Sequence, residues 1–219
     1  MTKQVRRIGI RDKRFSVPFA QDMCTLDAVI IGVAYLSRIY YTEAYDPTKT
    51  TSPTCWSMDT DTPAADVPEH QRQAGRCLDC VHNIKGSGSG TSRACRFTQK
   101  IALTLADDLH TVYQLQLPPT SIFGDIVKED MPFRAYARYL AALDTPLVTL
   151  VTKLFFDTNS GTPKLFFRPI RPLEEEELET VKVMMEHPDT LHAITANVIP
   201  IADVVESPFS EVGGFKLDS

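Results

Sequence analysis

The chain has 219 residues, of which 43% are hydrophobic and 23% charged, and its net charge is −5. This composition argues against disorder over most of the chain, and the length suits one domain with insertions or one domain plus a tail. Residues 1–100 carry 14 Lys/Arg against 10 Asp/Glu, and residues 101–219 carry 9 against 18. That division fits a nucleic-acid face followed by an acidic tail, with chance clustering as the alternative.

The N-terminal segment is basic, but no apolar signal-peptide segment follows it. Its cations are Lys3, Arg6, Arg7, Arg11, Lys13 and Arg14. The longest apolar run, residues 28–36, is far shorter than the roughly 20 residues that span a bilayer. We therefore expect a soluble cytoplasmic protein without membrane contact.

Residues 27–35 form a continuous apolar run that predicts a buried strand, and the aromatic residues 38–45 are expected to pair with it. Residues 46–94 are rich in Pro, Thr, Asp and Gly and show little periodicity. A loop of this length needs something to order it, and a metal ion would do so.

The β pattern returns after Cys95. In residues 96–105 apolar side chains alternate with polar and basic ones, and residues 111–117 return as the second strand of a hairpin. Helical spacing marks residues 131–143, with Asp130 as the expected cap. A second hairpin is expected at 147–169, then a helix from Pro172 to about His187 and an extended tail at 197–219.

These elements predict a mainly β fold with five to seven strands and one or two helices. The expected architecture is a small OB-like barrel with an inserted zinc-binding subdomain, a C-terminal helix and a tail. We place the OB-like nucleic-acid-binding domain at residues 1–171, its zinc-binding insertion at about 46–96, and the helix with the acidic tail at 172–219.

The cysteines carry the most specific signal. Cys77 and Cys80 form a Cys-x-x-Cys pair that can present two thiolates to one ion, and Cys55 and Cys95 flank the irregular segment. One structural Zn²⁺ held by these four cysteines is the favoured interpretation. A redox pair, free thiols, or His70 or His82 as a substitute ligand are the alternatives. Cys24 is expected to be a buried free thiol.

Nothing in the sequence supports an enzyme, because no zinc-deaminase, metalloprotease, P-loop, nucleophile-elbow or dinucleotide motif is present. Basic and aromatic residues instead suggest a groove for single strands, which needs cations for phosphates and flat rings for bases. Core packing of the aromatics and plain solvation of the cations are the alternatives. The predicted DNA-binding residues are Tyr40, Tyr41, Arg72, Arg76, Lys85, Arg93, Arg96, Lys100, Lys153, Phe155, Lys164, Phe166 and Arg168.

The segment running from Pro53-Thr-Cys55 through Cys77-x-x-Cys80, Asn83 and Gly86-Ser87 to Cys95 resembles bacteriophage-encoded zinc-containing single-stranded DNA-binding proteins. It also loosely resembles the helix-destabilising protein of T-even phages, whose zinc site includes a His. The resemblance covers mainly residues 27–171, and only its cysteine segment is specific.

This resemblance implies an OB fold, structural zinc, sequence-nonspecific binding to single-stranded DNA, and a role in phage replication, recombination or repair in the host cytoplasm. Replication or recombination proteins are the candidate partners of the acidic tail. The alternatives are a zinc-stabilised protein-interaction or transcription-regulating module and, third, a nuclease or recombinase subunit.

Overall fold

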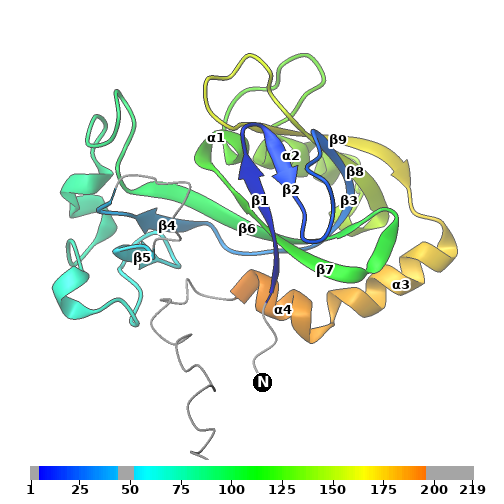
Figure 1. Cartoon of the computed structure of the whole chain (residues 1–219), viewed down its shortest axis with the longest axis horizontal. Helices are drawn as coiled ribbons and strands as arrows, with labels where there is room; N and C mark the ends of the chain where they lie inside the picture. The colour runs from blue at the N-terminus through cyan, green and yellow to red at the C-terminus, as the bar shows by residue number, and fades with distance from the viewer. Residues whose placement is uncertain (1–4, 44–51, 196–219) are drawn as a thin grey trace, which may run out of the picture.

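The computed structural model describes residues 5–43 and 52–195 (Figure 1). The strands in these ranges are β1 (Arg6–Arg11), β2 (Arg14–Ser16), β3 (Thr25–Val33), β4 (Ser37–Tyr40), β5 (Cys55–Ser57), β6 (Arg96–Leu105), β7 (Asp108–Leu117), β8 (Leu150–Phe156) and β9 (Leu165–Pro172). The helices are α1 (Pro119–Ile122), α2 (Phe133–Ala142), α3 (Glu175–Met185) and α4 (Pro188–Thr195), with short 3-10 turns η1 (Glu69–Gln71), η2 (Cys77–Asp79), η3 (Val81–Asn83) and η4 (Leu147–Thr149). The protein is mostly β, which confirms the predicted class.

Seven strands form one sheet in the order β2-β1-β7-β6-β3-β8-β9. All neighbours are antiparallel except β1 and β7, which run parallel. The sheet curls into a half-barrel, so that Phe15 of β2 meets Phe156 of β8 with ring centroids 4.6 Å apart. Strand β4 leaves this sheet and pairs with β5 and with the first residues of β6 (Figure 1).

The inner face of the half-barrel holds the main hydrophobic core. Alternation along β6 points Ile101 and Leu103 into this core, where both are fully buried. Helix α2 supplies Tyr136, whose ring stacks on Phe167 of β9 and whose hydroxyl lies 2.8 Å from Thr152 Oγ1. The hydrogen bond allows a polar atom to remain in an otherwise apolar core.

Helices α3 and α4 pack against the outer face and form a second, smaller hydrophobic cluster with it. Helix α4 approaches the sheet closely because Gly32 of β3 has no side chain. A Cβ placed there would lie 3.2 Å from Ile194 Cγ2. Gln114 of β7 donates a hydrogen bond to the backbone carbonyl of Ala193, which fixes the end of α4 to the sheet.

The expected hairpins at 96–117 and 147–169 and the helix at 131–143 are confirmed. The helix expected after Pro172 is also present as α3, whose first turn carries a reciprocal capping box between Glu174 and Glu177. Asp130 does not cap α2: its carboxylate pairs with Arg168 of β9, and Pro132 occupies the N-cap position.

One expectation about local structure was wrong, and two elements were not predicted. Residues 38–40 pair with β5 and β6 rather than with β3. The basic N-terminal segment is a hairpin, β1–β2, for which no strand was predicted. Pro188 stops α3 but also begins α4, since a proline fits the first turn of a helix. These additions raise the strand and helix counts above those predicted. The tail at 197–219 lies outside the described residues.

Candidate metal centre and nucleic-acid interface

Residues 37–43 and 52–98, here called the cysteine lobe, stand to one side of the half-barrel (Figure 1). The lobe buries few apolar side chains, chiefly Ile39, Trp56 and Val67. None of these three belongs to either hydrophobic cluster of the described chain. The lobe therefore lacks the continuous apolar core that orders the half-barrel.

All four predicted ligands lie in this lobe and line one small cavity of about 20 Å³. The ligands are Cys55, Cys77, Cys80 and Cys95. Cys24 lies elsewhere and is exposed, so its expected burial was wrong. Among residues 5–43 and 52–195, no three His, Cys, Asp or Glu side chains stand close enough to form a metal-binding group. The four thiols share one cavity, and zinc stays a prediction.

Backbone hydrogen bonds hold three of the cysteines at the cavity. The N–H of Cys77 donates to the carbonyl of Asp61 over 2.7 Å, and the N–H of Cys95 donates to the carbonyl of His82 over 2.8 Å. Cys55 lies on β5 opposite Tyr40 of β4. These links tie separate parts of the lobe to one point, as a chain folding around an ion requires.

A buried polar network lies beside the cavity. The Asn83 side-chain oxygen accepts hydrogen bonds from Arg38 at 2.7 Å and from Arg93 at 2.8 Å, and the Asn83 amide donates to the Cys77 carbonyl at 2.8 Å. The Arg38 guanidinium also lies 3.9 Å from the centroid of the Phe97 ring. Through Asn83 the network contacts the Cys77–Cys80 turn, and it holds the positive charge of Arg38 close to the thiols.

Burial controls the ionisation of these thiols. It raises the pKa values of Cys55 and Cys77 and raises the pKa of Cys95 to about 11. The Arg38 charge opposes the rise at Cys77 and Cys95, and neighbouring thiols add to it. The mutual influence shows that the four groups are electrostatic neighbours.

The histidines do not line the cavity. His82 stacks on Tyr40 with ring centroids 4.0 Å apart, and its Nε2 lies 3.1 Å from the Gln73 side-chain oxygen. His70 is exposed on η1. The same stacking leaves Tyr40 half-buried, with one ring face covered by His82.

The predicted DNA-binding cations of the lobe differ in what they contact. Arg72 folds back onto the carbonyls of Val67 and Ala65, and Arg76 forms an exposed ion pair with Asp61. Arg93 donates to Asn83 within the buried network. Lys85 and Arg96 are exposed at the surface of the lobe.

The late hairpin does not present an exposed row of Phe. Its inner face is buried, and Phe166 on the other face is only 3% exposed, so the ring of this predicted DNA-binding residue is covered in the structure. The Lys164 ammonium lies 4.4 Å from the Phe166 centroid and 3.3 Å from Asp157, and Arg168 lies over the ring of Phe155. Lys153 and Phe155 are half-buried. The cations of this face therefore cover its own aromatic rings.

A scan against protein-family models, a search of curated proteins and a search of solved structures each found no match. Within the described residues, no helix is long and apolar enough to cross a membrane.

Two surface residues with suitable chemistry, Tyr35 and Arg7, were missed. Tyr35, between β3 and β4, is 88% exposed, and the predicted Tyr41, which follows β4, is 39% exposed. Burial lowers the pKa of Lys100 to about 8, and the nearby Arg7 charge adds to this effect. Arg7 also influences the pKa of Tyr41, which places all three residues at the junction between lobe and sheet. Basic residues alternating with Ile in residues 7–11 were the available signal.

Proposed function

We propose that this protein is a non-enzymatic, sequence-nonspecific single-stranded DNA-binding protein with an OB-type barrel and a structural zinc in its cysteine lobe. The observation that carries the proposal is the strand order β7-β6-β3-β8-β9. Numbered along the chain, these five strands read three-two-one-four-five, and α1 and α2 lie between the third and fourth. That order, with a helix at that point, is compatible with an OB barrel and supports the proposal.

The position of the lobe supports the same function. In this numbering the lobe is the loop between strands one and two, and residues 157–164 are the loop between strands four and five. OB domains bind oligonucleotides with the surface of strands two and three and with these two loops. The lobe presents Lys85, Arg96 and Tyr41 at its surface. The loop between strands one and two therefore carries both the cations and the aromatic ring that binding of a single strand needs.

Zinc is the part of the proposal that explains how the lobe is ordered. Cys55, Cys77, Cys80 and Cys95 would hold the ion, since four thiolates are a standard ligand set for a closed structural site. The bound ion would supply the fixed centre that the missing apolar core does not. Four thiolates around Zn²⁺ carry a net charge of about −2, and the buried cation of Arg38 lies where it would offset part of that charge.

A second candidate function is a zinc-stabilised protein-interaction module. Leu78, Val81 and Ile84 are each more than half exposed on consecutive short turns of the lobe. Leu78 lies on η2, Val81 begins η3 and Ile84 follows it, so residues 78–84 form a short surface strip that exposes three apolar side chains. A partner protein would bury this strip, whereas a DNA strand would use the cations and tyrosines instead.

The deciding experiment is fluorescence titration with oligo(dT) and with duplex DNA at several salt concentrations. We expect preference for the single strand, with a log–log salt slope of about −0.7 per phosphate contact. Arg96→Gln should weaken binding, and Leu78→Ser should leave it unchanged. Equal or absent binding of both DNAs would remove the single-strand proposal in favour of the interaction module.

Zinc is tested separately by elemental analysis of the purified protein. We expect about one zinc per chain, retained in Cys24→Ser and lost or weakened in Cys95→Ser. A chelator should increase hydrogen exchange in the lobe more than in the half-barrel, because structural zinc contributes folding free energy directly. Zinc-free protein with a fully protected lobe would contradict the zinc proposal and leave the DNA-binding test standing.

A further inference from the structure

The outward face of the β1–β2 hairpin is strongly cationic. Ile8 is buried and Ile10 packs against the main core, so alternation turns the odd-numbered residues of β1 outward. Strand register places Arg14 opposite Arg11 and Ser16 opposite Gly9. The outward face consists of Arg7, Gly9, Arg11, Arg14 and Ser16.

The arginines of this face lie close together. Arg11 and Arg14 are directly opposed across the β1–β2 ladder, and the Arg14 guanidinium also donates a hydrogen bond to the carbonyl of Asp22 over 3.4 Å. Between them and Arg7 the surface is low, because Gly9 has no side chain and a Cβ placed there would contact only Ser16, at 3.6 Å and beyond. A chain of phosphates can approach such a surface closely, and its negative charge complements the row of arginines.

The hairpin extends the sheet surface that an OB domain uses. Because β1 runs parallel beside β7, its outward side chains continue the outer face of β6 and β7. Val5 packs into the outer cluster with α4, and Arg7 is the next outward residue along the strand. On β7, Gln116 is exposed and lies opposite Lys100 of β6. The part of the outer face not covered by α4 is thus polar and basic.

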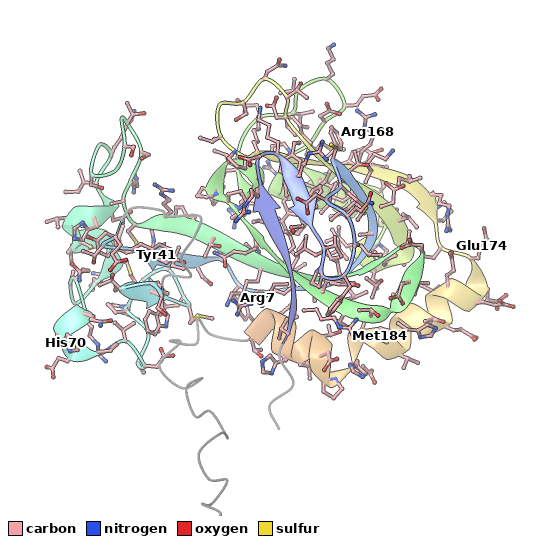
Figure 2. All side chains as sticks on the ribbon, in the orientation of Figure 1. Arg7, Tyr41, His70, Arg168, Glu174 and Met184 are labelled. Carbon is pink, nitrogen blue, oxygen red and sulfur yellow. The ribbon has the colours of Figure 1, made fainter. Side chains whose placement is uncertain are left out.

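The hairpin also joins the two loops that flank the proposed binding surface. Figure 2 shows Arg7 near the start of β1, on the side of the half-barrel that faces the lobe and its Tyr41. At the other end, the Lys13 ammonium donates a hydrogen bond to the carbonyl of Thr158 over 2.9 Å, in the turn between β8 and β9. Strand β1 therefore runs from the junction with the lobe to the turn at 157–164 (Figure 1).

We propose that the outward face of the β1–β2 hairpin binds the sugar-phosphate backbone of a single strand, carrying it from the cysteine lobe to the β8–β9 turn. Arg7, Arg11 and Arg14 contact phosphates, and Tyr41 with Lys100 marks where the strand enters. This inference rests on the proposed single-strand binding and adds a contact surface that lies outside the five OB-type strands.

The test compares two charge-matched double variants of the full chain. R11Q/R14Q removes two cations of the hairpin, and R138Q/K182Q removes two exposed cations from α2 and α3. Binding of oligo(dT) is measured by fluorescence anisotropy over a range of salt concentrations. R11Q/R14Q should bind more weakly by roughly two- to five-fold for each arginine. Its salt slope should flatten by about 0.7 for each phosphate that is no longer neutralised.

A further variant and one control outcome keep the result interpretable. R11K/R14K preserves the charges and should restore most of the salt slope, and all variants should melt within a few degrees of the wild type. If R11Q/R14Q binds like R138Q/K182Q while the wild type still prefers single strands, the hairpin does not bind phosphates and the proposed function stands. If the wild type shows no such preference, the proposed function fails first and this inference fails with it.

Discussion

Replacing Lys100 with Met should make the protein more stable at neutral pH. The Lys100 ammonium is half-buried beside Arg7, and burial followed by the Arg7 charge lowers its pKa from the ordinary 10.5 to about 8. Each pH unit of such a difference corresponds to about 1.4 kcal/mol. The charged form is therefore held at a cost of up to about 3 kcal/mol, and Lys100→Met should recover roughly 1–3 kcal/mol at pH 7 because Met retains the apolar stem.

The pH dependence of this difference follows from proton linkage. With a folded-state pKa near 8 and an unfolded-state pKa near 10.5, the unfolded chain binds more protons in that interval. The stability of the wild type therefore rises from pH 8 to pH 10.5, and the variant lacks this contribution. The stability gap between the two proteins should be full at pH 7 and should close as pH rises through this interval.

The measurement is urea denaturation of both proteins at about pH 7, 8, 9 and 10, with the midpoint and the slope fitted separately. Lys100→Arg serves as the control. Because an arginine keeps its charge throughout this pH range, the stability difference between Lys100→Met and Lys100→Arg should stay constant. A Lys100→Met protein that is less stable at neutral pH, or a gap independent of pH, would refute the argument that the charge is held against its burial. The same variant should bind oligo(dT) more weakly at neutral pH if Lys100 contacts phosphate.

Three further predictions test other parts of the chain. Asn83→Leu should cost roughly 2–3 kcal/mol and expose the lobe to hydrogen exchange, because the buried Arg38 loses its hydrogen bond to Asn83 and keeps only that to the Thr60 carbonyl; a melting temperature equal to that of the wild type would contradict this role. Tyr136→Phe should cost about 1–2 kcal/mol by urea denaturation without changing DNA affinity, because Thr152 loses its buried partner, and a neutral result would show that water replaces it. Truncation after residue 196 removes the acidic tail, which lies outside the described residues. If the tethered tail competes with DNA, truncation should raise the affinity for oligo(dT) at low salt but not at high salt, where charges are screened. An unchanged affinity at low salt would exclude this competition.

The elements predicted correctly from the sequence are those whose signal is local. Strand β6 places Phe97, Ile101, Leu103 and Leu105 on one face, and α2 repeats apolar residues at helical spacing, so the period of the pattern identifies both. The gathering of the four cysteines around one cavity was also predicted, because Cys-x-x-Cys spacing is rarely accidental in an otherwise uncored segment.

The failures concern features that depend on distant parts of the chain. Residues 37–40 carry no sequence signal for their partners, which are β5 and the first residues of β6, both far away along the chain or separated by the irregular segment. Phe166 looked exposed by alternation, yet Lys164 and Phe155 from the same face fold over it. The hairpin β1–β2 was missed because its many charges mask the alternation of Ile8 and Ile10.

The way the half-barrel ends bears on how the protein avoids aggregation. One edge is β2, only three residues long and carrying Arg14, and the other is β9, where Pro169 and Pro172 lack the N–H that another strand would need. Part of the β9 edge is also covered by a bridge from Met131 to Phe167. Short length, positive charge and proline are the features by which natural sheets discourage edge-to-edge pairing. These two edges should therefore resist strand addition from a second chain, even at the high local concentrations that the proposed binding to single-stranded DNA would produce.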